Sequence, residues 1–439
     1  MGLTTCKVQP FPQQKRIRAV EDYQHGNTQH LEKRRKRIAF FGHFDSSNFG
    51  NESTLQAILY HLRCFHPDAE VTCISTGHEA AVATHQIEAI PVAETFGKWR
   101  FRNPFLRAVR RICIGIPREL YSWPKYLMRL MRIDMLIIPG TGLLTDAYGL
   151  LGFGPYNMFK WSLIAKICRC KLLFVSVGAG PIYGILGRCF VRSSLSLADF
   201  RSYRDKSTVQ YLEGIGFRSD SDRVYPDLAF SLPEAAIPNR DTTKSRRCVV
   251  GLGLMEYGGM YSVLKPSSEN YLAYLENLVT VVNWLLAHEY DVRLLCGDLG
   301  DMHAKQQFSE LLRERLSVRD EGRIVDEPVL SVESLLSQIV ATDIVVATRF
   351  HNVLLALLCN KPVISISFHH KCASLMNAME LSGYCLDINE LKADRVIEKI
   401  CDLDVNADKL KRLIRQKVTE FRKALDEQYS VIFNDMQLG

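Results

Sequence analysis

The sequence is 439 residues long, with 47% hydrophobic and 23% charged residues, which is typical of a globular protein. This length predicts two or three domains, each large enough to bury its own core. The net charge of +7 is moderate and gives no reason by itself to expect a nucleic-acid-binding protein. No stretch approaches the roughly 20 apolar residues needed to cross a bilayer, so we expect a soluble or peripheral protein.

The 13 cysteines are odd in number and scattered along the chain, and several of them fall inside apolar runs. This usage indicates a reducing compartment and structural thiols rather than disulfides or zinc ligands. The N-terminus has no apolar central region of the kind found in secretory signals. The sequence therefore predicts a cytoplasmic protein with no metal site.

Residues 1–34 are polar, lack periodicity and end in the basic run LEKRRKR, which predicts a mobile basic arm. The ordered chain is expected to begin with the apolar run RIAFFG. Strand-like runs at 70–75, 133–140 and 171–178 then alternate with helical patterns at 53–65 and 156–168. Alternating strands and helices predict a parallel sheet covered on both faces, so residues 35–235 are expected to form an N-terminal Rossmann-like domain.

A polar stretch with two prolines follows, and we expect residues 236–247 to be a linker. The alternation then restarts, which predicts a second Rossmann-like domain over 248–404 and a C-terminal helix within 405–439. The predicted fold class is α/β, with two doubly wound domains facing a cleft as in glycosyltransferase-B-like proteins. Ligands of such sheets bind beyond the carboxyl ends of the strands.

Three glycine-rich loops follow expected strands, at 42–53, 139–146 and 176–182. Small residues there allow the backbone to line a cleft, and the helix after the first loop would offer N–H groups to an anion. The alternative for that first loop is a tight turn with a helix cap. The candidate cleft residues in these loops are Gly42, Asn48, Gly50, Gly140, Gly142, Gly178 and Gly180.

The stretch DIVVATRFHN places Arg349 and His351 at the carboxyl end of an apolar strand. A buried arginine is rare unless it is paired, so Arg349 predicts either a ligand site or a structural salt bridge. His351 is either a core or capping histidine or a group that moves protons. Lys371 follows the next strand, and we expect the two strand ends to share one crevice suited to an anion.

The segment SYRDKSTVQYLEGIGF adds another cation, Arg204, followed by Asp205 at the start of an expected helix. The structural alternative is that both residues only cap that helix. Read in order, six segments resemble motifs of the polysaccharide pyruvyl transferase family: NFGNE, GTGLLTD, SVGAGP, YRDKST, PDLAF and RFHNVLLALLCNKPVISIS. One departure is Asn51, which stands where the family pattern has an acid.

The resemblance implies transfer of a pyruvyl group from phosphoenolpyruvate to two hydroxyls of one sugar, which forms a cyclic ketal. Arg349 and Arg204 match the donor-binding arginines of the family and His351 matches its catalytic histidine, poised near neutral pH to exchange protons. We expect Lys371 to neutralise the leaving phosphate. Phosphoenolpyruvate is the co-substrate and no cofactor is implied; the acceptor is a saccharide of a polysaccharide or of its lipid-linked precursor.

Two alternatives remain open at this point. One is a glycosyltransferase of the two-Rossmann-domain type that uses a nucleotide sugar, because such folds host many activities. The other is a non-catalytic binding protein of the same fold. The Arg-x-His motif and the loops colinear with it favour the pyruvyl transferase.

Residues 98–132 match no motif and carry ten Lys or Arg against a single acid, Glu119. Aromatic residues are interleaved with these cations, which suits an anionic membrane surface. The alternative is a solvated basic insertion on the first domain. Nothing else in the chain resembles a nucleic-acid-binding module. We therefore expect an enzyme that is cytoplasmic or peripheral on the cytoplasmic face of the membrane.

Overall fold

The computed structural model places most of the chain in one compact unit, Lys36–Gly439, distinct from Met1–Arg35. The residues it describes are 35–44, 47–75, 85–93, 111–147, 149–150, 154–218, 222–239, 247–256, 268–315, 321–368 and 370–435. The expected basic arm, residues 98–110 of the basic segment and residues 240–246 of the expected linker lie outside these ranges.

The first half of the unit is built on a seven-stranded sheet, and all its strand pairs are parallel. The strands occur in the spatial order β3-β2-β1-β4-β5-β6-β7. They are β1 Arg37–Phe41, β2 Glu70–Ser75, β3 Glu88–Pro91, β4 Met135–Pro139, β5 Lys171–Val177, β6 Phe200–Tyr203 and β7 Arg223–Val224.

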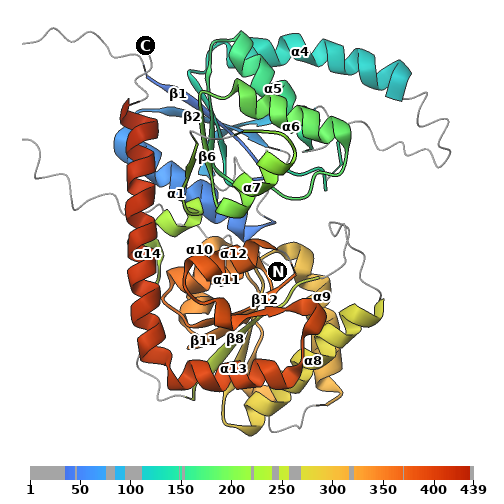
Figure 1. The fold of residues 1–439 in the computed structure, drawn as a ribbon, viewed down its shortest axis with the longest axis vertical. Coiled ribbons are helices and arrows are strands. Elements are labelled where there is room, and N and C mark those ends of the chain that lie inside the picture. The colour runs from blue at the N-terminus through green and yellow to red at the C-terminus, as the bar shows by residue number, and fades with distance from the viewer. Residues whose placement is uncertain are drawn as a thin grey trace, which may run out of the picture. The chain divides into compact units, whose positions relative to one another are not determined.

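Helices cover both faces of this sheet (Figure 1). They are α1 Phe49–Phe65, α4 Ile116–Leu130, α5 Pro155–Ile167, α6 Ile185–Leu197 and α7 Lys206–Gly214. Alternate residues of β1 point to opposite faces: Phe40 packs into the same cluster as Ile58 of α1, whereas Phe41 packs into the cluster of Trp161 of α5. Both faces are therefore buried, which explains why the central strands are continuous apolar runs.

The second half repeats the architecture around a six-stranded parallel sheet in the order β10-β9-β8-β11-β12-β13. Its strands are β8 Val249–Gly253, β9 Asp291–Leu295, β10 Ile324–Val325, β11 Ile344–Ala347, β12 Val363–Ser367 and β13 Cys385–Asp387. Its helices are α8 Ser268–Ala287, α9 Met302–Arg313, α10 Val332–Val340, α11 Phe350–Leu358, α12 His370–Ala378 and α13 Ala393–Val405. The predicted fold class of two doubly wound α/β halves is confirmed.

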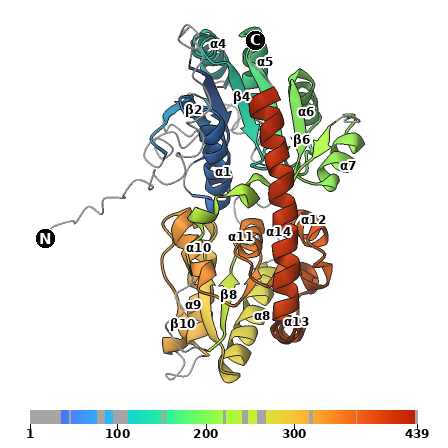
Figure 2. The ribbon, with the colours of Figure 1, turned by 90° about the vertical axis from the view of Figure 1, so that its left-hand side faces the viewer.

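The long C-terminal helix, α14 Ala407–Ser430, runs past both halves (Figure 2). Near its middle, Lys417 pairs with Glu380 of the second half at 2.5 Å. Near its end, the buried Gln428 side chain accepts a hydrogen bond from Ser176 Oγ at 3.0 Å and donates one to Ser202 Oγ at 2.7 Å. The helix thus ties the second half to strands β5 and β6 of the first.

Loops at the carboxyl ends of the two sheets meet through backbone hydrogen bonds. Phe49 N donates to Gly297 O at 3.2 Å, and Leu299 N donates to Ser47 O at 2.8 Å. These contacts bring the loop after β1 against the loop after β9, where the sequence predicts a cleft.

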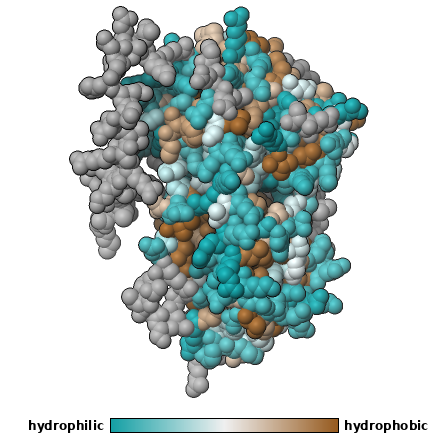
Figure 3. Space-filling model, turned by 60° about the vertical axis from the view of Figure 1, so that its left-hand side comes forward, coloured by the Kyte–Doolittle hydropathy of each residue, from teal (hydrophilic) through white to brown (hydrophobic). Residues whose placement is uncertain are grey.

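The face drawn in Figure 3 is mainly hydrophilic, with apolar residues in small separate groups, as is usual for a globular protein. None of the described helices combines the length and the apolar character needed to cross a bilayer.

Candidate active site

The stretch from Thr348 to His351 joins β11 to α11 at the carboxyl end of the second sheet. All of β11 is buried, and the residue at the N-cap of α11, Arg349, has extended backbone with φ −74° and ψ 132°. The side chains of α11 from residue 352 to residue 358 are all buried. Because this apolar helix is anchored in the core, Arg349 and His351 are held at the edge of the sheet.

His351 lies against the first half of the unit. A side chain at position 50 would overlap the imidazole, so only glycine lets α1 approach His351 this closely. Burial, together with two nearby arginines and a lysine and against the opposing effect of Asp227, lowers the pKa of His351 to about 4. Its Nε2 is buried and makes no hydrogen bond within the described part of the chain. The imidazole is therefore neutral at pH 7, which corrects the expectation that it titrates near neutral pH.

Arg204 follows strand β6 and is 9% exposed. Its Nη1 donates to Asp227 at 3.1 Å, its Nε lies 3.6 Å from the Asp205 carboxylate, and its guanidinium covers the Phe350 ring at 4.5 Å. Nε and Nη2 are buried without a hydrogen bond among the described residues. A buried arginine with two unsatisfied nitrogens is costly, and a ligand anion would satisfy them.

Lys371 begins α12, beside the loop that follows β4. A Cβ at Gly142 would lie 3.4 Å from the Lys371 Nζ, and Gly142 itself has a φ of +67°, which favours glycine. Burial and the Arg204 charge, against the opposing effect of Asp205, lower the pKa of Lys371 to about 8. The ammonium group thus lies near the Arg204 guanidinium and near the Asp205 and Asp227 carboxylates.

The structure brings three of the predicted side chains together, because His351 interacts electrostatically with both Arg204 and Lys371. Each of the three packs against a different predicted glycine-rich loop. The pairs are Gly50 with His351, Gly142 with Lys371, and Gly178 with Arg204.

The other predicted cleft glycines serve local packing. Added side chains at these positions would meet Phe44, the carbonyl of Ser176 and Thr145, respectively, rather than any of the cations; the positions are Gly42, Gly140 and Gly180.

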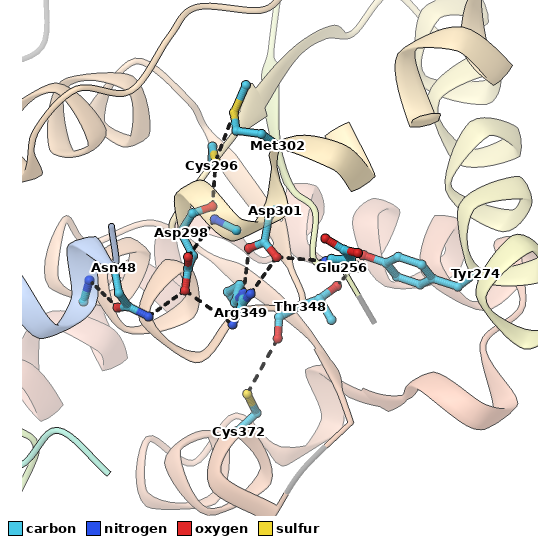
Figure 4. Close-up of polar contacts among 12 residues, drawn as sticks. Asn48, Glu256, Tyr274, Cys296, Asp298, Asp301, Met302, Thr348, Arg349 and Cys372 are labelled. Atoms are coloured by element: carbon cyan, nitrogen blue, oxygen red, sulfur yellow. Dashed lines mark hydrogen bonds and ion pairs between the residues drawn. The ribbon is translucent and has the colours of Figure 1, made fainter. Parts of the chain in front are cut away.

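Arg349 also lies at this edge but is paired (Figure 4). Its Nε and Nη2 each donate to the Asp301 carboxylate at 2.6 Å, and Nη1 lies 3.7 Å from Asp298. Asp301 is 1% exposed and also accepts a hydrogen bond from Glu256 N at 2.8 Å. Arg349 therefore makes the buried salt bridge that the sequence left open as an alternative, while its side chain stays 29% exposed.

The N-termini of α1 and α11 differ in how their N–H groups are used. In α1, Asn48 Oδ1 accepts hydrogen bonds from Gly50 N and Asn51 N, and Asn48 Nδ2 donates to Asp298. The N–H groups of Phe49 and Glu52 bind backbone carbonyls. The expectation of free N–H groups for an anion is wrong for α1, because the helix-cap alternative applies. Helix α11 has no side-chain cap.

Three residues of the site were not predicted from the sequence. Asp227 lies in the PDLAF segment, but that motif alone does not indicate that the carboxylate pairs with Arg204. Asp301 is 48 residues from Arg349, its partner, and its segment GDLGD resembles an ordinary helix start. Phe350 sits between two singled-out residues, and only the fold shows that its ring supports Arg204.

The described residues contain no group of three His, Cys, Asp or Glu side chains placed to hold a metal ion.

Comparisons with known proteins agree with the fold. Staphylococcus aureus MnaA, in a structure with UDP, is 15% identical at a TM-score of 0.57, covering 92% of this chain and 98% of its own. A UDP-N-acetylglucosamine 2-epimerase assigned in Listeria monocytogenes is 10% identical at 0.61, with the same coverage. Anabaena HepE with UDP is 13% identical at 0.54, covering 90% and 99%.

These identities are low, so the similarity establishes the fold alone. A search of curated protein sequences finds no match. A family model described as polysaccharide pyruvyl transferase matches residues 48–370, a range that contains Asn48, Arg204, Arg349 and His351.

Proposed function

Because this chain belongs to the polysaccharide pyruvyl transferase family, we propose that it transfers the pyruvyl group of phosphoenolpyruvate to two hydroxyls of one sugar, forming a ketal. The acceptor is a sugar of a polysaccharide or of its lipid-linked precursor. The observation that carries the proposal is the pair of unsatisfied buried nitrogens of Arg204, placed beside His351 and Lys371.

The donor has two anionic groups, and the site offers separate partners for them. The unsatisfied Nε and Nη2 of Arg204 form one edge of a planar fork, which suits bidentate binding of a carboxylate or phosphate. Lys371 and the uncapped start of α11 offer positive charge to the other group. Arg349, held by Asp301, adds a third cation at the rim.

The reaction moves two hydroxyl protons. One becomes part of the new methyl group at the donor's methylene carbon, and the other leaves with the phosphate. The first hydroxyl oxygen bonds to the central carbon, the bond from that carbon to the phosphate oxygen breaks, and the second hydroxyl closes the ring. His351, neutral at pH 7, accepts a hydroxyl proton and passes it on. Lys371 neutralises the departing phosphate.

A second candidate function is glycosyl transfer from a nucleotide sugar. The observation that favours it is the fold shared with MnaA and HepE, whose structures contain UDP. The family match over residues 48–370 and the cations grouped around His351 favour pyruvyl transfer. A non-catalytic binding protein is the third possibility, since Asn51 departs from the family pattern.

Donor consumption tests the proposal. The protein is incubated with candidate acceptor glycans and either phosphoenolpyruvate or nucleotide sugars, and released phosphate, released nucleotide and acceptor mass are measured. We expect phosphate release together with a pyruvyl ketal on the acceptor. Nucleotide release with a sugar-sized mass gain would instead identify a glycosyltransferase, and donor binding with no turnover of any acceptor would identify a binding protein.

We also propose that the enzyme works at the cytoplasmic face of the membrane, where a lipid-linked acceptor would be presented.

A further inference from the structure

The outward face of α4 and of the turn before it is largely apolar. Tyr121 is 81% exposed, Leu120 66% and Met131 63%. The exposed residues between 113 and 132 are mostly apolar, include two arginines and contain no acid: Cys113, Ile114, Pro117, Leu120, Tyr121, Pro124, Met128, Arg129, Met131 and Arg132. The solvent-exposed face of a surface helix is normally polar, whereas this exposed face is largely apolar.

The core does not need this outward face, because α4 has a second, inward face that is already packed. Tyr126 and Leu130 are buried there, and the Tyr126 ring lies 4.7 Å from the ring of Trp161 in α5. The only acid of the basic segment also points inward, where Glu119 accepts hydrogen bonds from Lys160 at 2.8 Å and from Tyr156 at 3.0 Å. The outward face is left with apolar side chains and cations.

We propose that this outward face of α4 docks the protein onto an anionic lipid bilayer. Long cationic side chains can reach the headgroups while the apolar side chains between them enter the acyl boundary, and tyrosine suits that interface. A second copy of this chain is a poor occupant, because a symmetric contact would place cation against cation. The charge of the face thus selects an anionic surface.

The figures locate this face relative to the two halves. Helix α4 ends at Leu130, just before β4 begins. Figure 1 shows α4 beside α5, at the end of the first half that lies away from the second half. Docking through α4 would therefore place the membrane against that end of the first half.

Vesicle co-sedimentation of the full chain tests the proposal, with phosphatidylcholine vesicles and with vesicles that also contain phosphatidylglycerol. We expect binding only to the second kind, weakened by salt. A variant with Leu120→Ser, Tyr121→Ser and Met128→Ser should lose about tenfold or more in vesicle affinity, because such binding scales with buried apolar area. These side chains are exposed, so the fold should survive.

The matched control carries Leu272→Ser, Leu330→Ser and Val405→Ser, which change exposed apolar residues of the second half. It should bind like the wild type, whereas Arg129→Glu with Arg132→Glu should bind less. Equal binding by the α4 variant and its control would overturn the proposal. A wild-type protein that binds neither kind of vesicle would also overturn it. This holds even if the α4 substitutions dissociate an oligomer in solution.

Discussion

Arg204 and Arg349 both belong to the candidate active site, but their guanidinium groups are paired differently. The Arg349 guanidinium is engaged bidentately by Asp301, whereas Arg204 shares only Nη1 with Asp227 through a hydrogen bond and keeps two buried nitrogens unsatisfied. Yet Arg349 is the more exposed side chain, at 29% against 6%. Burial alone therefore does not tell which arginine is structural.

These two pairing states indicate where binding energy for an anion is available. A ligand at Arg204 satisfies two nitrogens that make no hydrogen bond among the described residues, with only the longer 3.6 Å ion pair to Asp205 beside them. A ligand at Arg349 must share the guanidinium with Asp301, so part of its gain is offset. We infer that Arg204 supplies the main donor contact and that Arg349 supports it from the rim.

The largest expected effect is on turnover and comes from His351, which interacts electrostatically with both arginines. His351→Gln should lower turnover about 100-fold or more, because general acid–base catalysis contributes on this scale. Donor affinity should change less. His288→Gln, an exposed histidine remote from the glycine-rich loops, is the matched control and should keep full activity. Unchanged turnover in the His351 variant would remove it from proton transfer and leave Lys371 as the candidate.

Arg349→Ala separates the two roles of that side chain. It should weaken phosphoenolpyruvate binding about tenfold or more, from the loss of about 1.5–3 kcal/mol for a charge-assisted contact. It also leaves the Asp301 carboxylate, 1% exposed, without its partner, so the free energy of unfolding should fall as well. Calorimetric binding and chemical denaturation measure the two effects.

Asp301→Asn is the companion variant, because it breaks the pair and keeps the arginine. If Arg349→Ala destabilises the fold but binds the donor normally, then Arg349 is purely structural.

The pH dependence of kcat/KM should show whether the reaction needs the charge of the Lys371 ammonium group. Its lowered pKa of about 8 means that the ammonium loses its charge as pH rises through 8, so kcat/KM should fall there. Lys371→Arg keeps its charge throughout this range and should lose the alkaline fall, whatever its absolute activity. Identical alkaline limbs in the two proteins would show that Lys371 does not carry the charge that the donor needs.

The smallest effect on catalysis is expected far from both arginines, in α14. Gln428→Leu leaves the buried Ser176 hydroxyl without its partner, which should cost about 1–3 kcal/mol of unfolding free energy. Turnover at saturating donor should stay unchanged. A large loss of turnover would show that α14 also sets the geometry of the cleft.

The sequence predicts the fold well because its central strands are continuous apolar runs, as at β8 and β11, and helical patterns alternate with them. It does not reveal β6 or β13, since these are short and only partly buried. Placing Arg349 and His351 at a strand end was correct because β11 stops abruptly before a helix.

What the sequence cannot supply is the pairing of distant side chains. The Arg349–Asp301 salt bridge joins loops after β11 and β9, and the approach of Gly50 to His351 joins the two halves. The lowered pKa of His351 follows from that assembly and not from its neighbours in the chain. The local sequence pattern therefore identifies the residues at strand ends, whereas the tertiary structure determines which of them are paired and how their pKa values shift.

Calorimetric titration of phosphoenolpyruvate into the wild-type protein and into Arg204→Ala tests the donor site most directly, after unfolding curves confirm that the variant is folded. We expect saturable binding to the wild type, a loss of about tenfold or more in the variant, and partial recovery in Arg204→Lys, which restores the charge without the fork. A folded Arg204→Ala protein that binds phosphoenolpyruvate as tightly as the wild type would contradict the assignment of Arg204 as the main donor contact.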